Sequence, residues 1–475
     1  MAAFSNRRLR PGPRPARDLA RIVFGKVVKL ARRVLAKGTV KTVHEPVIVP
    51  REHHTVSRAD ISEAALKVLY RLKKEGYAAY LVGGGVRDIL LGLHPKDFDI
   101  ATDATPEQVR GLFRNCRVIG RRFKLAHVVF GQEVIEVATF RAQSESGDRR
   151  QSAQGMLLRD NVYGSIEDDA VRRDFTINAL YYNIADFSVV DYVGGLEDLK
   201  KRQLRMIGDP EVRYREDPVR MLRAARLAAK LELNIESATA APMLKLAGLL
   251  REVSPARLFD ETSKLFLMGS AEATFDCLRT HALFEELFPL TAKALKQDVE
   301  GKTEALIRRA LANTDTRVAE DKPVTPGFLY AALLWAPVQH VFEKRIARGE
   351  SASDAFQHAV SEVLDKQCQH TAIPRHFTTM MREIWTLQHR LPSRAGKRAE
   401  RLFEHPRFRA AYDFLVLRAD VGEIERELAD WWTEWQEVDA RGREALLKQV
   451  AGAEEKGAAR RRKRGPRKKT APSQH

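Results

Sequence analysis

The chain has 475 residues, of which 44% are hydrophobic, so it can bury substantial cores and has the length of two to four domains. Its three cysteines are odd in number and far apart, which argues against a disulfide framework or a zinc site and indicates a reducing cytoplasmic setting. The formal net charge is +18, yet residues 1–44 hold twelve Arg and Lys against one acid and 456–475 hold nine against none, so the body between these tails is close to neutral.

Between Leu19 and Lys37, apolar residues recur at helical spacing and basic residues lie on a neighbouring flank. Such a basic amphipathic helix can lie on an anionic membrane, bind RNA or dock on a partner protein. Its glycine and the lack of a long uncharged run argue against a membrane-spanning helix or a secretory signal. We expect a cytoplasmic protein, for which peripheral contact with the inner face of the membrane is an open alternative.

The segment 79–102 joins a glycine-rich turn to two closely spaced aspartates. The apolar run 79–82 predicts a buried strand, and 86–91 predicts one or two helical turns. Between them lie three consecutive glycines, Gly83, Gly84 and Gly85. Glycines let backbone N–H groups approach phosphate oxygens, and the helix start, with Arg87, adds positive charge. The alternative is an ordinary tight turn, because the segment matches neither the P-loop nor the dinucleotide fingerprint.

Asp97 and Asp99 follow this turn. If residues 97–101 form a strand, both carboxylates face the same side, about 7 Å apart, and Phe98 points into the opposite layer. Two like charges at that spacing are unfavourable unless a cation lies between them, and hard oxygen ligands suit Mg²⁺. A solvated sheet edge or an Asx turn is the alternative for an isolated pair.

Glu136 is a third candidate metal ligand. Two apolar runs, 125–130 and 134–140, flank Gly131 and predict a β-hairpin with Glu136 in the middle of its second strand. An unpaired buried carboxylate would cost several kcal/mol. Glu136 is therefore turned to solvent, paired with an arginine such as Arg141, or directed at metal ions beside the two aspartates.

Five segments resemble, in this order, the nucleotidyltransferase superfamily of bacterial poly(A) polymerases and CCA-adding tRNA nucleotidyltransferases. They are GGGVRDILLG, KDFDIAT, IEVATFR, RRDFTINAL from Arg172 and YREDPVRMLRAARLAAKL from Tyr214. The resemblance implies that Asp97, Asp99 and Glu136 hold two Mg²⁺ ions, which activate an RNA 3′-hydroxyl for in-line attack on the α-phosphate of ATP and steady the departing pyrophosphate.

Further site residues follow from the same resemblance. Asp174 is implied to be a fourth active-site acid, and its neighbours Arg172, Arg173 and Asn178 are similar to residues that contact sugar and phosphates. Without the other motifs, Asp174 would be interpreted as a surface helix start.

Asp217 and Arg220 are implied to read the incoming base, because a carboxylate acceptor and a forked donor can imitate a base-pairing edge. The same segment also predicts a helix that starts at Pro218, with Met221, Leu222, Ala225 and Leu227 on its buried side.

The resemblance favours the poly(A) polymerase branch over most of the chain, about residues 45 to 435. The expected enzyme is a polynucleotide adenylyltransferase, which adds adenylates to RNA 3′ ends without a template and thereby promotes RNA decay. Two alternatives stay open: a CCA-adding enzyme, and a non-catalytic RNA-binding protein with a degenerate head.

The expected fold is α+β, with a small mixed β-sheet head followed by an all-helical body. The resemblance implies that the sheet of the head has five strands and that the helical part forms a neck, a body and a leg. The region 315–325 is expected to be a polar connection. The expected segments are a basic N-terminal extension (1–55), a catalytic nucleotidyltransferase head (56–203), a base-recognising neck (204–270), an RNA-binding helical body and leg (271–440), and a disordered basic tail (441–475).

The C-terminal tail from Lys456 is too charged and too poor in apolar residues to fold alone. We expect the tail and the helical body to bind RNA 3′ ends, with sequence-independent and salt-sensitive affinity in the tail. A merely solubilising tail is the alternative. Other expected partners are ATP and the RNA-decay machinery, and the chain is expected to be a monomer.

Overall fold

The computed structural model of the protein describes residues 45–120, 124–142, 150–151, 157–159 and 162–463. The amphipathic helix predicted between Leu19 and Lys37 and the last part of the basic tail, 464–475, lie outside these residues. None of the helices in the described part combines the length and the apolar character that a transmembrane span requires.

The head contains an eight-stranded mixed sheet in the order β1-β10-β9-β2-β3-β6-β5-β4, wider than the five strands expected. Its strands are β1 (Val47–Val49), β2 (Ala79–Val82), β3 (Asp99–Thr102), β4 (Cys116–Ile119), β5 (Leu125–Phe130), β6 (Glu133–Thr139), β9 (Leu180–Asn183) and β10 (Val189–Asp191). Strands β3 and β6 are parallel, and the other neighbouring pairs are antiparallel. Because β1 pairs with β10, the segment predicted as the N-terminal extension contributes an edge strand to the head.

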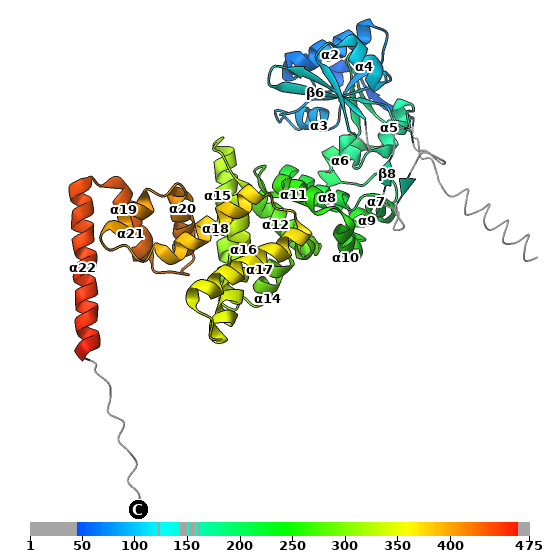
Figure 1. Cartoon of the computed structure of the whole chain (residues 1–475). Coiled ribbons are helices and arrows are strands. Elements are labelled where there is room, and N and C mark those ends of the chain that lie inside the picture. The colour runs from blue at the N-terminus through cyan, green and yellow to red at the C-terminus, as the bar shows by residue number, and fades with distance from the viewer. Residues whose placement is uncertain (1–44, 121–123, 143–149, 152–156, 160–161, 464–475) are drawn as a thin grey trace, which may run out of the picture. The chain divides into compact units, whose positions relative to one another are not determined.

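Two helices, α2 (Glu63–Lys74) and α4 (Pro106–Leu112), cover one face of this sheet (Figure 1). Successive side chains of β3 and β6 point to opposite faces of the sheet, as strand geometry requires, so every second residue is buried under α2 and α4. The opposite face carries a smaller apolar cluster, to which α5 (Ile166–Arg172) contributes. The head also contains α3 (Gly84–Leu90) and α6 (Gly195–Lys200).

Short elements complete the head and its junction with the helical region. They are the two-stranded sheets β7 (Arg150–Gln151) with β8 (Leu157–Arg159) and β11 (Gln203–Leu204) with β12 (Asn234–Ile235), and the 3₁₀ turns η1 (Arg51–His53), η2 (Arg58–Asp60), η3 (Thr176–Asn178) and η4 (Ala247–Glu252).

The rest of the described chain is helical. It comprises α7 (Pro210–Glu216), α8 (Val219–Leu231), α9 (Ser237–Ala240), α10 (Met243–Leu246), α11 (Pro255–Phe266), α12 (Ala271–Thr280), α13 (Leu283–Leu287), α14 (Pro289–Lys296), α15 (Lys302–Ala319), α16 (Pro326–Ala347), α17 (Ala352–His370), α18 (Arg375–Arg390), α19 (Lys397–Phe403), α20 (Phe408–Asp420), α21 (Arg426–Glu437) and α22 (Ala440–Lys463).

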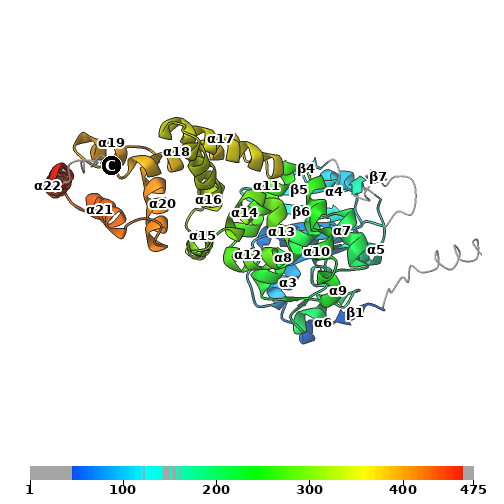
Figure 2. The ribbon, with the colours of Figure 1, turned by 90° about the horizontal axis from the view of Figure 1, so that it is seen from below.

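Helix α16 packs beside α15, α17 and α18, as Figures 1 and 2 both show. A separate apolar cluster further along the chain is built around Trp431, Trp432 and Trp435 of α21. The predicted stripe of α8 is confirmed, since Met221, Leu222, Ala225 and Leu227 are all buried. The predicted mixed-sheet head and helical remainder are therefore correct.

The prediction of a polar connection over residues 315–325 is wrong in its first part, because α15 continues to Ala319. Asp315 lies inside this helix, where its carboxylate accepts the backbone N–H groups of Ala271 and Glu272 at 2.7 and 3.2 Å. Asp315 therefore serves the start of α12, whose first N–H groups have no partner within their own helix. The connection between α15 and α16 is limited to residues 320–325.

Candidate active site

The glycine-rich turn connects β2 to α3 and has a backbone conformation that requires glycine. Gly83 has φ +74° and donates its N–H to the carbonyl of Leu180 in β9 at 3.3 Å. A Cβ atom at Gly83 would lie 3.6 Å from Nη1 of Arg173, so there is room for a side chain at this position. The positive φ angle, however, strains any residue other than glycine. Gly84 and Gly85 begin α3.

Asp99 and Glu136 occupy directly opposed positions on the parallel strands β3 and β6. Ile100 and Val137, the next residue on each strand, belong to the core under α2 and α4. Asp99 and Glu136 therefore lie on the other face, where the strand alternation sets their side chains next to each other.

Asp97 precedes β3 and does not belong to it, contrary to the predicted strand over 97–101. The ladder with β2 ends at the pair Val82 and Asp99, because the chain turns away at Gly83. Asp97 nevertheless lies near enough to Asp99 for its negative charge to contribute to the raised pKa of Asp99.

The pKa of Asp99 is raised from its ordinary value to about 6. Although Asp99 is partly exposed to solvent, the main cause is the desolvation of its carboxyl group by the protein around it, followed by repulsion from Glu136, while Arg173 opposes the shift and Asp97 adds to it. Glu136 also meets His127 of β5, whose Nε2 lies 3.4 Å from Oε2. Of the three environments considered for Glu136, the structure shows a half-exposed side chain beside Asp99 and His127, and Arg141 is not its partner.

Asp174 is held in a network of donors. Its carboxylate lies 2.7 Å from Nη2 of Arg223 in α8, and it accepts the Nδ2–H of Asn178 at 3.2 Å and the N–H of Phe175 at 2.8 Å. Burial alone would raise the pKa of Asp174, but Arg223 and these hydrogen bonds outweigh burial and lower it. Asp174 is therefore a carboxylate whose charge is balanced by the protein itself.

Arg173 and Arg172 lie where α5 ends. Arg173 donates to Oδ2 of Asp169 from Nε and Nη2, at 3.2 and 2.9 Å, and its Nε also donates to the hydroxyl of Tyr181 at 3.0 Å. These contacts hold the guanidinium beside Gly83. Arg172 is half-buried, and its carbonyl accepts a hydrogen bond from Nη2 of Arg213.

Arg87 and Asn178 form a buried link between α3 and η3. Arg87 is only 5% exposed, and its guanidinium donates to Oδ1 of Asp88 from Nε and Nη2 at 2.8 and 2.5 Å and to Oδ1 of Asn178 at 2.5 Å. The arginine predicted to contact phosphate is thus engaged inside the protein, where it fixes the glycine turn relative to η3.

Asp217 and Arg220 lie together where α7 meets α8. Both carboxylate oxygens of Asp217 accept from Arg257 of α11, at 2.9 and 2.8 Å. Arg220 donates from Nη1 to the carbonyl of Arg213 at 2.7 Å and to Oε2 of Glu216 at 3.0 Å. The two side chains predicted to read the base are therefore held by neighbours in fixed orientations.

The structure thus brings Asp97 and Glu136 each near Asp99, and Arg173 lies beside the glycine turn and near enough to Asp99 to act on its charge. Arg223 connects this acidic cluster electrostatically to Asp174. Sequence reasoning missed His127, Arg223 and Arg257. Only Arg223 had a local signal, because it lies one helical turn after Arg220 in the same motif.

Among the described residues, no three His, Cys, Asp or Glu side chains are close enough to enclose a metal ion. The cluster nevertheless has the chemistry of a Mg²⁺ site, since its donors are carboxylate oxygens. Desolvation and the nearby charge of Glu136 raise the pKa of Asp99, and a bound cation would counteract both effects by favouring the carboxylate form. The described residues thus fit divalent metal ions in the type of their donor atoms, and not in the arrangement of three ligands.

Three family models match the chain. "Poly A polymerase head domain" matches residues 79–205, "Probable RNA and SrmB- binding site of polymerase A" matches 232–295, and "Polymerase A arginine-rich C-terminus" matches 348–469. The first of these ranges contains the acidic cluster and the glycine turn.

Among curated proteins, poly(A) polymerase I of Escherichia coli O6:H1 is 51% identical over 94% of this chain and 98% of its own length. Poly(A) polymerase I of Haemophilus influenzae is 46% identical over 85% of this chain and 90% of its own. The CCA-adding enzyme of Bacillus pumilus is more distant, at 37% identity over 47% of this chain and 54% of its own.

Among solved structures, the CCA-adding enzyme of Bacillus stearothermophilus in complex with CTP superposes with a TM-score of 0.53 at 25% identity, over 77% of this chain and 80% of that one. The fold and the acidic cluster on its mixed sheet define a nucleotidyltransferase. Within that class, the chain belongs to the poly(A) polymerase family, as the identity over nearly its whole length shows.

Proposed function

We propose that the enzyme adds adenylates from ATP to RNA 3′ ends without a template and releases pyrophosphate, with the cluster of Asp97, Asp99 and Glu136 as its catalytic centre. The observation that carries this proposal is the opposed pair of Asp99 and Glu136 on β3 and β6, within a chain half identical to a poly(A) polymerase over nearly its full length.

The acidic cluster is proposed to hold two Mg²⁺ ions. When bound, these ions supply activation of the 3′-hydroxyl and neutralisation of charge on the triphosphate. The protein's part is to hold Asp99 and Glu136 side by side on the sheet. Arg173 and Arg223 lie near Asp99 and offset part of the rise in its pKa, which favours the carboxylate form that metal binding needs.

The nucleotide is proposed to lie between the glycine turn and α8. Backbone N–H groups after Gly83 and the side chain of Arg173 would face the phosphates, while Asp217 and Arg220 would contact the base. Arg257 keeps both oxygens of Asp217 in place. A carboxylate held in this way can accept from the amino group of adenine without having to order itself during binding.

The remaining assignments are proposals as well. The proposed segments are an N-terminal extension, a catalytic head, a base-recognising neck, an RNA-binding body and leg, and a basic tail. Two of their predicted limits are wrong, because β1 belongs to the sheet of the head and because α22 extends over Ala440–Lys463, within the segment predicted to be a disordered tail. The protein is proposed to act in the cytoplasm as a monomer, where tailing RNA would serve RNA processing and recruit the decay machinery. The basic segment between Leu19 and Lys37 would provide peripheral contact with the membrane.

Extension of unstructured RNA with single nucleotides tests the function. Purified protein is incubated with Mg²⁺, an RNA lacking a CCA-type end, and each nucleoside triphosphate separately. A ladder with ATP alone, absent in an Asp97→Ala/Asp99→Ala variant, is the expected result. Extension of tRNA only, ending after CCA, would instead assign the chain to CCA addition.

A further inference from the structure

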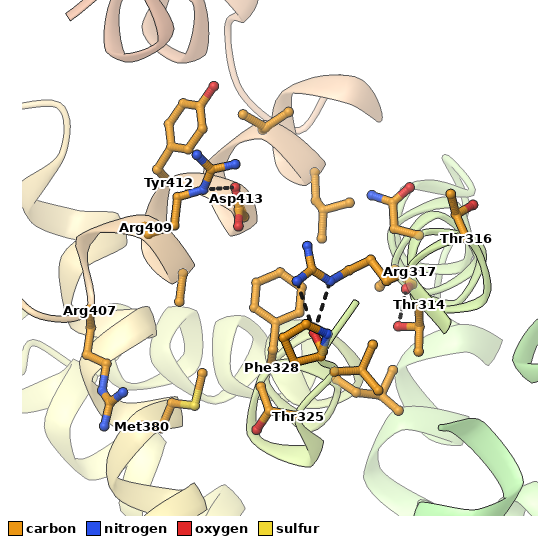
Figure 3. Close-up of a pocket in the computed structure, with 18 of the residues that line it drawn as sticks. Thr314, Thr316, Arg317, Thr325, Phe328, Met380, Arg407, Arg409, Tyr412 and Asp413 are labelled. Carbon is orange, nitrogen blue, oxygen red and sulfur yellow. Dashed lines mark hydrogen bonds and ion pairs between the residues drawn. The ribbon is translucent and has the colours of Figure 1, made fainter. Parts of the chain in front are cut away.

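A cavity of about 620 Å³ lies within the helical region, away from the acidic cluster. It opens between α15, the start of α16, α18 and α20 (Figure 3). Its α15 and α16 walls fall between the ranges matched by the family models, which end at residue 295 and resume at 348. Cavities of this volume accommodate one small ligand or one unit of a polymer.

The cavity is mainly apolar, and two aromatic side chains line it, Phe328 of α16 and Tyr412 of α20. The aliphatic side chains on its walls include Leu329, Val416 and Leu417. Phe328 is half-buried and meets Phe414 edge to face, with ring centroids 6.1 Å apart. A flat aromatic ligand can stack against such a side chain, and every nucleobase offers a face for this contact.

Three arginines lie at the cavity, and they differ in their partners. Arg407 contacts Glu383, with its Nε 3.0 Å from Oε2, and Arg409 contacts Asp413, with its Nε 2.9 Å from Oδ1. Arg317 instead donates from Nε and Nη2 to the carbonyl of Pro323, at 3.2 and 2.9 Å.

Arg317 forms no direct ion pair with a described carboxylate, although Asp413 and Glu320 lie near enough for their charges to interact with it, and its Nη1 donates to no described residue. Figure 3 shows its guanidinium projecting into the cavity near Phe328. A cation held by a neutral carbonyl, with donors to spare, is suited to a phosphate group.

Two further groups can read the edge of a ring. Asn313 is exposed at the rim and its amide makes no hydrogen bond to a described residue. Asp413 faces the cavity across from Arg317, and its carboxyl group can accept from an amino group. Apolar walls, an aromatic ring, a cation and an amide together match the parts of one nucleotide.

We infer that this cavity binds one unpaired nucleotide of the RNA substrate upstream of its 3′ end, with the base stacked on Phe328 and a phosphate on Arg317. The inference rests on the proposed function, since it concerns the RNA that the enzyme extends. Arg407 and Arg409 are exposed beside the cavity, and although each is paired with a carboxylate, they add guanidinium donors near the phosphates on either side of the bound nucleotide.

Binding of the full-length chain to a labelled single-stranded oligoadenylate, measured by fluorescence anisotropy, tests the inference. Phe328→Leu keeps an apolar side chain but removes the aromatic face, and Arg317→Gln removes the cation. Arg348→Gln is the matched control, because Arg348 is likewise exposed just at the end of a helix of this region, α16, and does not line the cavity.

We expect both cavity variants to bind oligoadenylate about fivefold or more weakly, the lower end of the effect of losing one base–aromatic stack. The slope of log affinity against log salt should fall by about 1 for Arg317→Gln and stay unchanged for Phe328→Leu. The KM for ATP, measured at saturating RNA, and the affinity of Arg348→Gln should equal those of the wild type.

Unchanged oligoadenylate affinity in both folded variants would overturn the inference. Weaker binding of free ATP or AMP with unchanged binding of oligoadenylate would also overturn it, in favour of a free-nucleotide site. Should Phe328→Leu fail to fold, Arg317→Gln and a photocrosslink remain. An 8-azidoadenosine RNA should label peptides around 323–329 or 406–417 of the wild type, and labelling elsewhere only contradicts the inference. Wild-type extension of RNA by ATP, scored separately, shows whether the proposed function itself fails.

Discussion

Asp99 and Glu136 face each other across β3 and β6, the only parallel pair in the eight-stranded sheet among the described residues. Both carboxylates point away from the core that α2 and α4 cover, and repulsion between them contributes to a pKa of about 6 for Asp99. The sheet thus holds two carboxylates close together although they repel each other. Because this arrangement costs stability, we interpret their proximity as a requirement of function.

The first prediction concerns this repulsion in metal-free protein. Because the folded pKa of Asp99 is above its unfolded value near 3.8, folding favours the protonated acid, and this stability is lost as pH rises from about 4 to about 6. Asp99→Asn should therefore be more stable than the wild type above pH 6, by on the order of 1 kcal/mol after allowance for solvent screening. Urea unfolding in chelator at both ends of this range measures the difference, and a variant less stable than wild type at pH 7.5 contradicts it.

The second prediction concerns the contact between Asp174 and Arg223. Asp174→Asn leaves Arg223 without its carboxylate and should destabilise the protein by about 2 kcal/mol near pH 7. The pKa of Asp174 is lowered, so the stability it provides is present above about 4 and is lost as pH falls through the lower folded value. The gap between wild type and variant, measured by urea unfolding, should narrow at acid pH. A gap that stays constant with pH would argue against the ion pair.

The third prediction separates the backbone role of Gly83 from its role in the site. Gly83 and Gly92 both have φ +74°, and a Cβ atom at Gly92 would meet no atom within 4 Å. Each replacement by alanine should cost about 1 kcal/mol in thermal or urea unfolding because of the backbone angle. Only Gly83→Ala should also raise the KM for ATP. Equal KM values in the two variants would show that the turn does not contact the nucleotide.

The fourth prediction concerns the fork between Arg257 and Asp217. Arg257→Lys keeps the charge but cannot hold both oxygens of the carboxylate. We expect kcat/KM for ATP to fall about tenfold, equivalent to about 1.4 kcal/mol, and the preference for ATP over CTP to decrease with it. Steady-state kinetics with each nucleotide provide the measurement. A loss that is the same for ATP and CTP would place Arg257 outside base selection.

Local patterns of the sequence were sufficient to predict several parts of the site. Three features could be predicted from the period of apolar residues and from turn chemistry, each within one short segment. They are the turn formed by the glycines at 83–85, the hairpin that carries Glu136 and the buried stripe of α8. The roles of the acidic residues came from resemblance to a family.

Relationships between distant segments could not be predicted in this way. The contact between Asp217 and Arg257 joins residues 40 positions apart, and the opposed positions of Asp99 and Glu136 depend on which strands become neighbours. The end of the β2 ladder at Asp99 excluded Asp97 from the strand. Asp315 has the polar character of a loop residue, but its carboxylate oxygens accept the N–H groups at the start of another helix, α12. That contact explains why an acidic residue stands inside α15. In each case a contact between segments far apart in the sequence determines the local structure, and such a contact cannot be predicted from the pattern of a single sequence.

The most direct test of the central claim is the single-turnover rate of adenylate addition to unstructured RNA by Asp99→Asn. Its matched control is Asp365→Asn, which changes an exposed aspartate of α17 without a described side-chain partner. If Asp97, Asp99 and Glu136 form the catalytic centre, Asp99→Asn should lose about a hundredfold to a thousandfold in rate, the scale of a lost group that stabilises the transition state. Asp365→Asn should retain the wild-type rate. Addition of adenylate by Asp99→Asn at a rate near that of the wild type would contradict the account.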